Sequence, residues 1–178
     1  MDPKLRGAGD PPKSWTYYGN AVWLPEPVGP QIFPRGHTIS ADVTIPNGGA
    51  EGVIACAGLF SAGWTLYIKD RKPVFHYTFF EIADVTVPGT LELPAGKVTL
   101  KSEFTPDGSK EGGGTLKLFV NGKPAGEGKL QRTSFRHGLE PFEIGRDSIT
   151  PIDHAYKNKG QFPFTGTIEK VTFELSGK

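Results

Sequence analysis

Oxygen-bearing side chains gather in one short segment, GRDSITPIDHAY, which follows an expected strand. Its Asp147, Thr150 and Asp153 offer carboxylate and hydroxyl oxygens, the hard donors that calcium prefers. The same side chains can instead hydrogen-bond to the backbone of their own turns, as Asp and Thr commonly do in loops. The segment therefore predicts either a calcium site or a self-bonded loop. Calcium is the one cofactor that the sequence suggests.

Four ring-bearing side chains are candidates for contacting a sugar ligand. Trp15 and Tyr17 lie in WTYYGNAVW, where strand alternation places them on one face and Tyr18 on the other. Tyr67 and His76 belong to the non-core face of an expected hairpin. Rings of this kind line many ligand sites. Ordinary packing, or a solvated strand face, explains the same pattern, so both readings stay open for Trp15, Tyr17, Tyr67 and His76.

The sequence contains little that indicates a catalytic site. A glycosidase needs two carboxylates about 5–10 Å apart, but Glu169 and Glu174 differ by five positions and so face opposite sides of a regular strand. Cys56 lies in the apolar run VIACAGLF, where a thiol is usually a small core residue. The histidines lack metal-ligand spacing, and no nucleophile-elbow motif occurs. The sequence thus predicts no catalytic residue.

The elements that must position these side chains are short strands separated by Pro, Gly and Asn clusters. We expect strands at 15–18, 21–24, 37–45, 52–57, 64–69, 74–80, 97–104, 115–120, 125–130, 141–144 and 167–175. Helical periodicity never extends beyond about two turns. This pattern predicts an all-β fold, an antiparallel two-sheet jelly-roll sandwich.

Two hairpins can be located from their turns. Asn121-Gly122 is the preferred dipeptide of a two-residue turn. A similar turn at Asp70-Arg71 sets Leu66 opposite Phe75 and gathers the large apolar residues of 64–80 on one face. The other face, which we expect to be solvated, carries Thr65, Tyr67, Lys69, Val74, His76 and Thr78.

The length and net charge of the chain indicate how it can fold and which partners it can bind. A chain of 178 residues is long enough to bury a core without disulfides or metals. The net charge of +1 gives no electrostatic case for nucleic acid, and no apolar run reaches the length of a membrane span.

Residues 1–13 are expected to form a flexible tail and 14–178 a single domain. The single cysteine leaves the localisation open.

A resemblance emerges from the order of several motifs. The segments SAGWTLYIKDRKPVFHYTF, LPAGKVTLKSEF, GTLKLFVNGKPAGEG, PFEIGRD and FTGTIEKVTFEL follow one another as in concanavalin-A-like and laminin-G-like jelly rolls. More narrowly, the chain resembles the C-terminal β-sandwich domain of bacterial arylsulfatases, from HTISADV to GTIEKV. The sulfatase nucleophile motif, Cys/Ser-x-Pro-Ser-Arg, is absent.

The arylsulfatase resemblance implies a non-catalytic accessory domain. Its partner would be a sulfatase catalytic domain or, in an oligomer, a second copy of this chain. An alternative is a stand-alone lectin-like domain that binds glycans, with calcium as an optional cofactor. A glycosidase of the same fold is a weaker alternative.

Overall fold

The computed structural model describes residues 12–20, 23–25, 28–134 and 140–176. Within these ranges the chain forms strands joined by turns, together with the short 3-10 turn His154–Tyr156. The strands are β1 (Ser14–Tyr18), β2 (His37–Ile45), β3 (Gly52–Leu59), β4 (Ala62–Lys69), β5 (Lys72–Phe79), β6 (Ala83–Pro88), β7 (Gly96–Pro106), β8 (Gly114–Val120), β9 (Lys123–Leu130), β10 (Phe142–Ile144) and β11 (Thr167–Leu175). No helix in the described ranges is long and apolar enough to cross a membrane.

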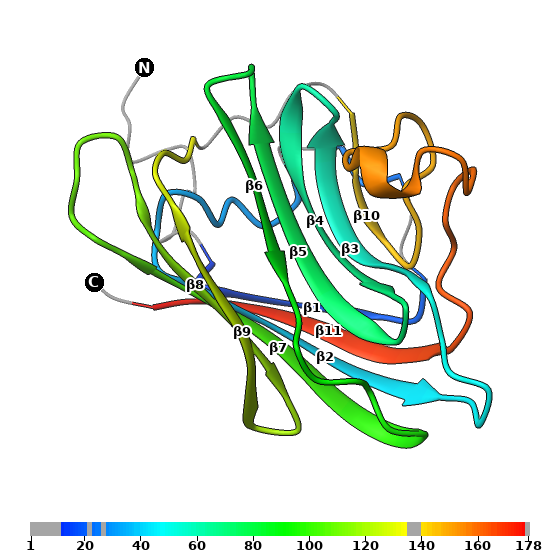
Figure 1. Ribbon diagram of the computed structural model, residues 1–178. Coiled ribbons are helices and arrows are strands. Elements are labelled where there is room, and N and C mark those ends of the chain that lie inside the picture. Colours follow the sequence, from blue (N-terminus) through cyan, green and yellow to red (C-terminus); the bar gives the residue numbers. More distant parts are fainter. Residues whose placement is uncertain (1–11, 21–22, 26–27, 135–139, 177–178) are drawn as a thin grey trace, which may run out of the picture.

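The strands form two antiparallel sheets that pack face to face (Figure 1). The six-stranded sheet has the order β1-β11-β2-β7-β8-β9, and the five-stranded sheet has the order β10-β3-β4-β5-β6. The first and last strands of the chain therefore lie side by side. The predicted all-β, antiparallel jelly-roll sandwich is confirmed.

Most expected strands are present, and the differences are local. Strand β6 was missed, although Ala83–Pro88 pairs with β5 along its whole length. The strand expected at 21–24 lies partly outside the described residues, and Leu24 forms only an isolated bridge to Phe142. Of the expected tail, 1–13, only residues 12 and 13 are described. The tail and the single domain over 14–178 stay predictions.

The main core lies between the two sheets and is rich in aromatic rings. Trp64 stacks parallel to Phe75 with ring centroids 6.0 Å apart, and Phe142 meets Phe173 edge-on at 5.4 Å. Each of these side chains is almost completely buried. Burying one large apolar side chain contributes about 1.5–3 kcal/mol, so this layer stabilises the sandwich strongly.

The predicted register of the β4–β5 hairpin and the predicted two-residue turn at Asn121-Gly122 are confirmed. In β4–β5, Leu66 lies opposite Phe75, and Asp70 and Arg71 adopt φ values of 50° and 64°. In β8–β9, Asn121 and Gly122 adopt φ values of 50° and 75°. Two consecutive left-handed residues give a turn whose twist matches the twist of the flanking strands.

The outer face of the five-stranded sheet is covered, which corrects the expectation that it is solvated. Residues 146–163, here called the covering segment, fold back over β3 and β4 beside β10 (orange in Figure 1). A second apolar cluster forms between them, from Val53, Cys56, Tyr67, Ile152, Tyr156 and Phe162. The alternation of β4 and β5 did not reveal this cover because it comes from a distant loop.

Candidate functional site

The outer face of the six-stranded sheet is open and polar. Strand β2 alternates strictly, burying Ile39, Ala41 and Val43 and leaving the residues between them half exposed. The neighbouring strands follow the same alternation, so hydroxyl, carboxylate and ammonium groups line the outer side. Among the described residues, this face lacks the cover that lies over the other sheet.

One row of side chains runs straight across four strands of this face. The strand registers place Tyr18 opposite Lys170, Lys170 opposite Asp42, and Asp42 opposite Thr99. Tyr18 is 74% exposed and stands on the edge strand β1. Asp42 accepts a hydrogen bond from Thr99 Oγ1 at 2.8 Å and lies 3.5 Å from the Lys170 ammonium. The row therefore joins an exposed ring to a connected set of polar groups.

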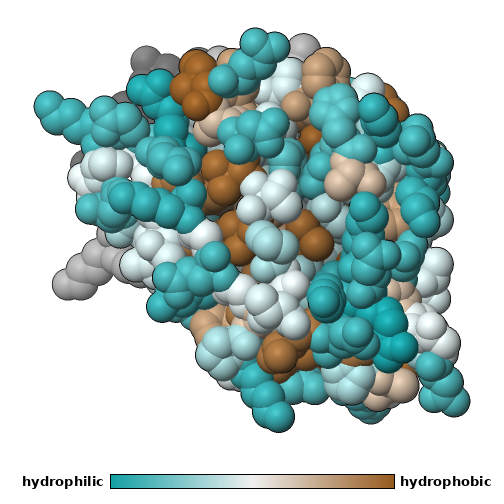
Figure 2. All heavy atoms as spheres, viewed as in Figure 1, coloured by the Kyte–Doolittle hydropathy of each residue, from teal (hydrophilic) through white to brown (hydrophobic). Residues whose placement is uncertain are grey.

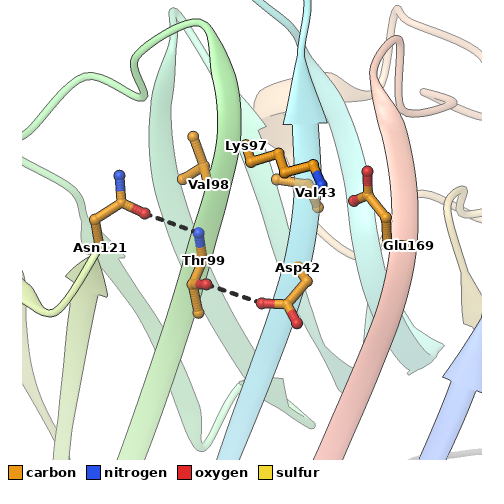
Figure 3. A pocket seen from close by; sticks show the side chains of 7 residues that line it. All are labelled: Asp42, Val43, Lys97, Val98, Thr99, Asn121 and Glu169. Carbon is orange, nitrogen blue, oxygen red and sulfur yellow. Dashed lines mark hydrogen bonds between the residues drawn. The ribbon is translucent and has the colours of Figure 1, made fainter.

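A hollow of about 290 Å³ lies at the end of this row (Figure 3). It is lined by Asp42, Val43, Lys97, Val98, Thr99, Asn121 and Glu169. Asn121, from the β8–β9 turn, accepts a hydrogen bond from the Thr99 amide at 2.9 Å through its side-chain oxygen. Lys97 extends from β7 across β2 toward Glu169 on β11 (Figure 3). The tight turn thus holds an amide group at the rim of the hollow.

A β-bulge brings Glu169 into the hollow and corrects the expectation for this strand. The pairing of β11 with β2 shifts between Ile168 and Lys170, so Glu169 is an extra residue. Glu169 and Glu174 are both exposed, while Ile168 is buried. Thr44, on the outer side of β2, donates to Glu169 Oε1 at 2.6 Å. Glu169 and Glu174 therefore share the outer face, although they differ by five positions.

These groups suit binding better than glycoside cleavage. Asp42 and Glu169 form the carboxylate pair of the hollow, but Asp42 is 41% exposed and ion-paired and Glu169 is exposed. A glycosidase acid typically lies in an apolar pocket that keeps it protonated. What the hollow offers is a mixture of hydrogen-bond donors and acceptors. Such a mixture matches the hydroxyl groups of a sugar.

Trp15 and Tyr17 share a face, as expected, and this face points to the core. Both pack against the main cluster, and Tyr17 lies 5.0 Å from Phe142 and 6.0 Å from Phe173 between ring centroids. Burial raises the pKa of Tyr17. The exposed aromatic of this strand is Tyr18, which the sequence placed on the opposite face but did not select. Binding by Trp15 and Tyr17 stays a prediction.

Tyr67 and His76 lie under the covering segment, where the structure brings them together with Asp153. The Tyr67 hydroxyl donates to Asp153 Oδ2 at 2.8 Å, and His76 Nδ1 lies 3.6 Å from the same oxygen. His76 is buried, which lowers its pKa, while Asp153 and Asp84 act in the opposite direction. Two of the four predicted sugar contacts, Tyr67 and His76, thus form a buried polar cluster with the predicted calcium ligand Asp153.

Asp147 and Thr150 have separate partners. Asp147 Oδ2 accepts from the Ile152 amide at 2.9 Å and from the Tyr156 hydroxyl at 2.7 Å. The Thr150 hydroxyl donates to Glu140 at 2.8 Å. Of these, only the bond between Asp147 and the Ile152 amide is a backbone contact within the segment, as the alternative reading expects, whereas Thr150 bonds to a carboxylate outside the segment. Calcium at Asp147, Thr150 and Asp153 stays a prediction.

A buried acidic group accompanies this loop. Glu143 and Asp147 have carboxylate oxygens within 4.8 Å of each other and of the Cys56 thiol. Burial raises the pKa of Asp147 to about 6, and the nearby Glu143 and Glu140 add to this effect. Cys56 is buried, as expected, and its thiol donates to the Arg146 carbonyl at 3.4 Å. The covering segment is therefore attached to its sheet by polar contacts as well as apolar ones.

The fold of this chain is similar to the folds of solved structures. No protein-family model and no curated protein matches this sequence. Among solved structures, the CBM40 domain of the Ruminococcus gnavus IT-sialidase, bound to α2,3-sialyllactose, superposes with a TM-score of 0.58. The identity is 13%, over 92% of this chain and 94% of that domain. The chain has a lectin-like jelly-roll fold.

A second neighbour supports the same fold. Domains LG4-5 of the mouse laminin α1 chain match with a TM-score of 0.54 at 14% identity, over 90% of this chain and 39% of that one. The concanavalin-A-like and laminin-G-like part of the expected resemblance is thus confirmed at the level of fold. These neighbours are not arylsulfatases, and they leave that narrower resemblance without support.

Proposed function

We propose that this chain is a non-catalytic, lectin-like domain that binds glycans on the outer face of its six-stranded sheet. The observation that carries the proposal is the row from Tyr18 to Thr99, which ends in a polar hollow. An exposed ring beside a few convergent polar groups is the usual composition of a small-ligand site. The ring would pack on the apolar face of one sugar unit, while Asp42, Thr99 and Asn121 would bond to the hydroxyls of neighbouring units along the row.

The Tyr18→Ala substitution is expected to weaken glycan binding about tenfold or more, because aromatic anchors carry much of the energy of such sites. Isothermal titration against a glycan that binds the native chain measures this. Phe60→Ala is the matched control, since Phe60 is also an exposed ring but lies at the β3–β4 turn of the other sheet. Equal affinities for native chain and Tyr18→Ala would contradict the proposed site.

A second candidate function is the accessory role that the arylsulfatase resemblance implies. The observation that favours it is an apolar tip formed by Phe60, Phe80 and Ile82, which are all more than half exposed. The Phe80 amide donates to the Ser61 carbonyl and so joins the two turns that carry the tip. In the view of Figure 2, apolar residues form small groups between hydrophilic ones.

This second candidate makes its own prediction for self-association. If the tip packs against a second copy, the native chain should dimerise with rising concentration in sedimentation experiments. Replacing all three tip residues, Phe60, Phe80 and Ile82, by Ser should then restore the monomer. A native chain that stays monomeric at high concentration would argue against a second copy as the partner and leave a catalytic domain as the alternative.

A further inference from the structure

We infer that the ligand of the open face is an extended, uncharged polysaccharide segment that crosses the strands, rather than a single terminal or acidic sugar. This inference rests on the proposed function and adds the class of glycan. It follows from two features of the face: the length over which binding groups continue, and the balance of its charges.

The binding groups continue well beyond the first hollow. A second hollow of about 380 Å³ is lined by Thr90, Lys117, Leu118, Phe119, Pro124, Gly126 and Glu127. The two hollows lie near each other at the end of β8, because Asn121, which lines the first, is two positions from Phe119, which lines the second. Phe119 lies opposite Lys101 of β7, whose ammonium sits 4.4 Å from the ring centroid. Phe119 therefore belongs to the same outer face as the row from Tyr18 to Thr99.

The distance between the two rings sets the length of the ligand. Tyr18 is on β1 and Phe119 on β8, which are separated by four strand intervals in the order β1-β11-β2-β7-β8. At the usual strand spacing these intervals span about 19 Å. A pyranose unit of an extended chain advances by about one such spacing, so the track accommodates about four or five units. Both ends would then be held by an aromatic ring.

The charges of the face are matched in pairs. Lys170 lies 3.5 Å from Asp42, Lys101 lies 3.1 Å from Glu103, and Lys117 lies 3.6 Å from Glu127. The first hollow adds Lys97 and Glu169, one charge of each sign, to the pair of Asp42 and Lys170. A surface of balanced charge attracts neither anions nor cations over a distance. An acidic glycan would meet the carboxylates of Asp42 and Glu169, whereas a neutral one would bond to the same groups without repulsion.

Calorimetric titration with oligosaccharides of defined length tests the inference on the full chain. The ligands are neutral gluco-, manno- and N-acetylglucosamine oligomers of one to six units, together with oligouronates of the same lengths. We expect affinity for one neutral series to rise up to four or five units and then to level off. We also expect less than about a twofold change between low and high salt, because few ions are released. Oligouronates should bind more weakly.

Variants at the far end of the track separate a long site from a short one. Phe119→Ala should weaken binding of the pentamer about tenfold and leave the dimer unchanged, since the dimer would occupy the Tyr18 end. Lys117→Ala tests the same end if Phe119→Ala does not fold, because Lys117 is exposed beside the second hollow. Phe80→Ala is the control at a site remote from this sheet.

The outcomes distinguish this inference from the proposed function. Affinity that does not depend on length, or that is tighter for oligouronates, would overturn the inference and keep the glycan-binding function. Equal losses for dimer and pentamer in Phe119→Ala would also overturn it. Failure of every oligosaccharide to bind would overturn both.

Discussion

Replacing Gly52 by Ala is expected to destabilise the domain by about 3 kcal/mol or more and to detach the covering segment. Gly52 has φ of +118°, a conformation that side-chain-bearing residues rarely adopt. A Cβ atom here would lie 2.5 Å from the Phe164 Cα and even closer to the Pro163 carbonyl. The obstacle is backbone, which cannot rotate away. Chemical denaturation measures the loss, and hydrogen exchange of the Val53 amide, bonded to the Phe162 carbonyl at 2.9 Å, reports the detachment.

The same substitution at Gly48 is the control for this prediction. Gly48 lies in the β2–β3 connection, four residues before Gly52, is exposed, and has nothing within 4 Å of an added Cβ. Gly48→Ala should therefore change the free energy of unfolding by less than about 0.5 kcal/mol. If Gly52→Ala is tolerated as well as Gly48→Ala, the covering segment does not lie against β3 as described.

Replacing Asp147 by Asn is expected to change how stability depends on pH. Burial raises the pKa of Asp147 from an ordinary value of 3.8 to about 6 in the folded state. The folded state therefore binds the proton of Asp147 more tightly than the unfolded chain does. The protonated carboxyl contributes its full stabilisation at pH values below 3.8. This stabilisation is lost as the pH rises through 6, and the loss approaches about 3 kcal/mol. An asparagine side chain at this position keeps an oxygen that accepts hydrogen bonds from Ile152 and Tyr156 but carries no charge.

Urea unfolding of both proteins between pH 4 and pH 7.5 measures this difference. Relative to the native chain, Asp147→Asn should become more stable as the pH rises across that range. Both proteins must be measured, because His37, buried with a pKa lowered to about 4, makes the native chain less stable as the pH falls. That contribution is common to both proteins and cancels. A difference that does not vary with pH would show that Asp147 is not buried as a carboxylate.

The fold could be predicted from the sequence because its signals are local. Alternation over 37–45 and 167–175 located β2 and β11 to the residue, and turn dipeptides located both two-residue hairpins. The face covered by residues 146–163 could not be predicted in the same way. Its cover depends on a contact between Tyr67 and Tyr156, which are 89 positions apart in the sequence and 5.1 Å apart between ring centroids.

Only part of the candidate site could be predicted from the sequence. Alternation correctly separated Tyr18 from Trp15 and Tyr17, but it does not say which of the two faces is the core. The packing of β1 against Phe142 and Phe173 decides that question. The prediction that Glu169 and Glu174 face opposite sides is wrong because a bulge breaks the two-residue period, and the β11 sequence carries no Gly to mark it. Tertiary contacts therefore select the site.

The most direct test of the glycan-binding account is chemical-shift mapping by NMR with a neutral oligosaccharide that raises the melting temperature of the chain. The account predicts that the shifted amides cluster on the outer face of the six-stranded sheet, around Tyr18, Asp42, Thr99 and Lys170. Shifts confined to the apolar tip, or to the region of Tyr67 and Asp153 under the covering segment, would contradict it.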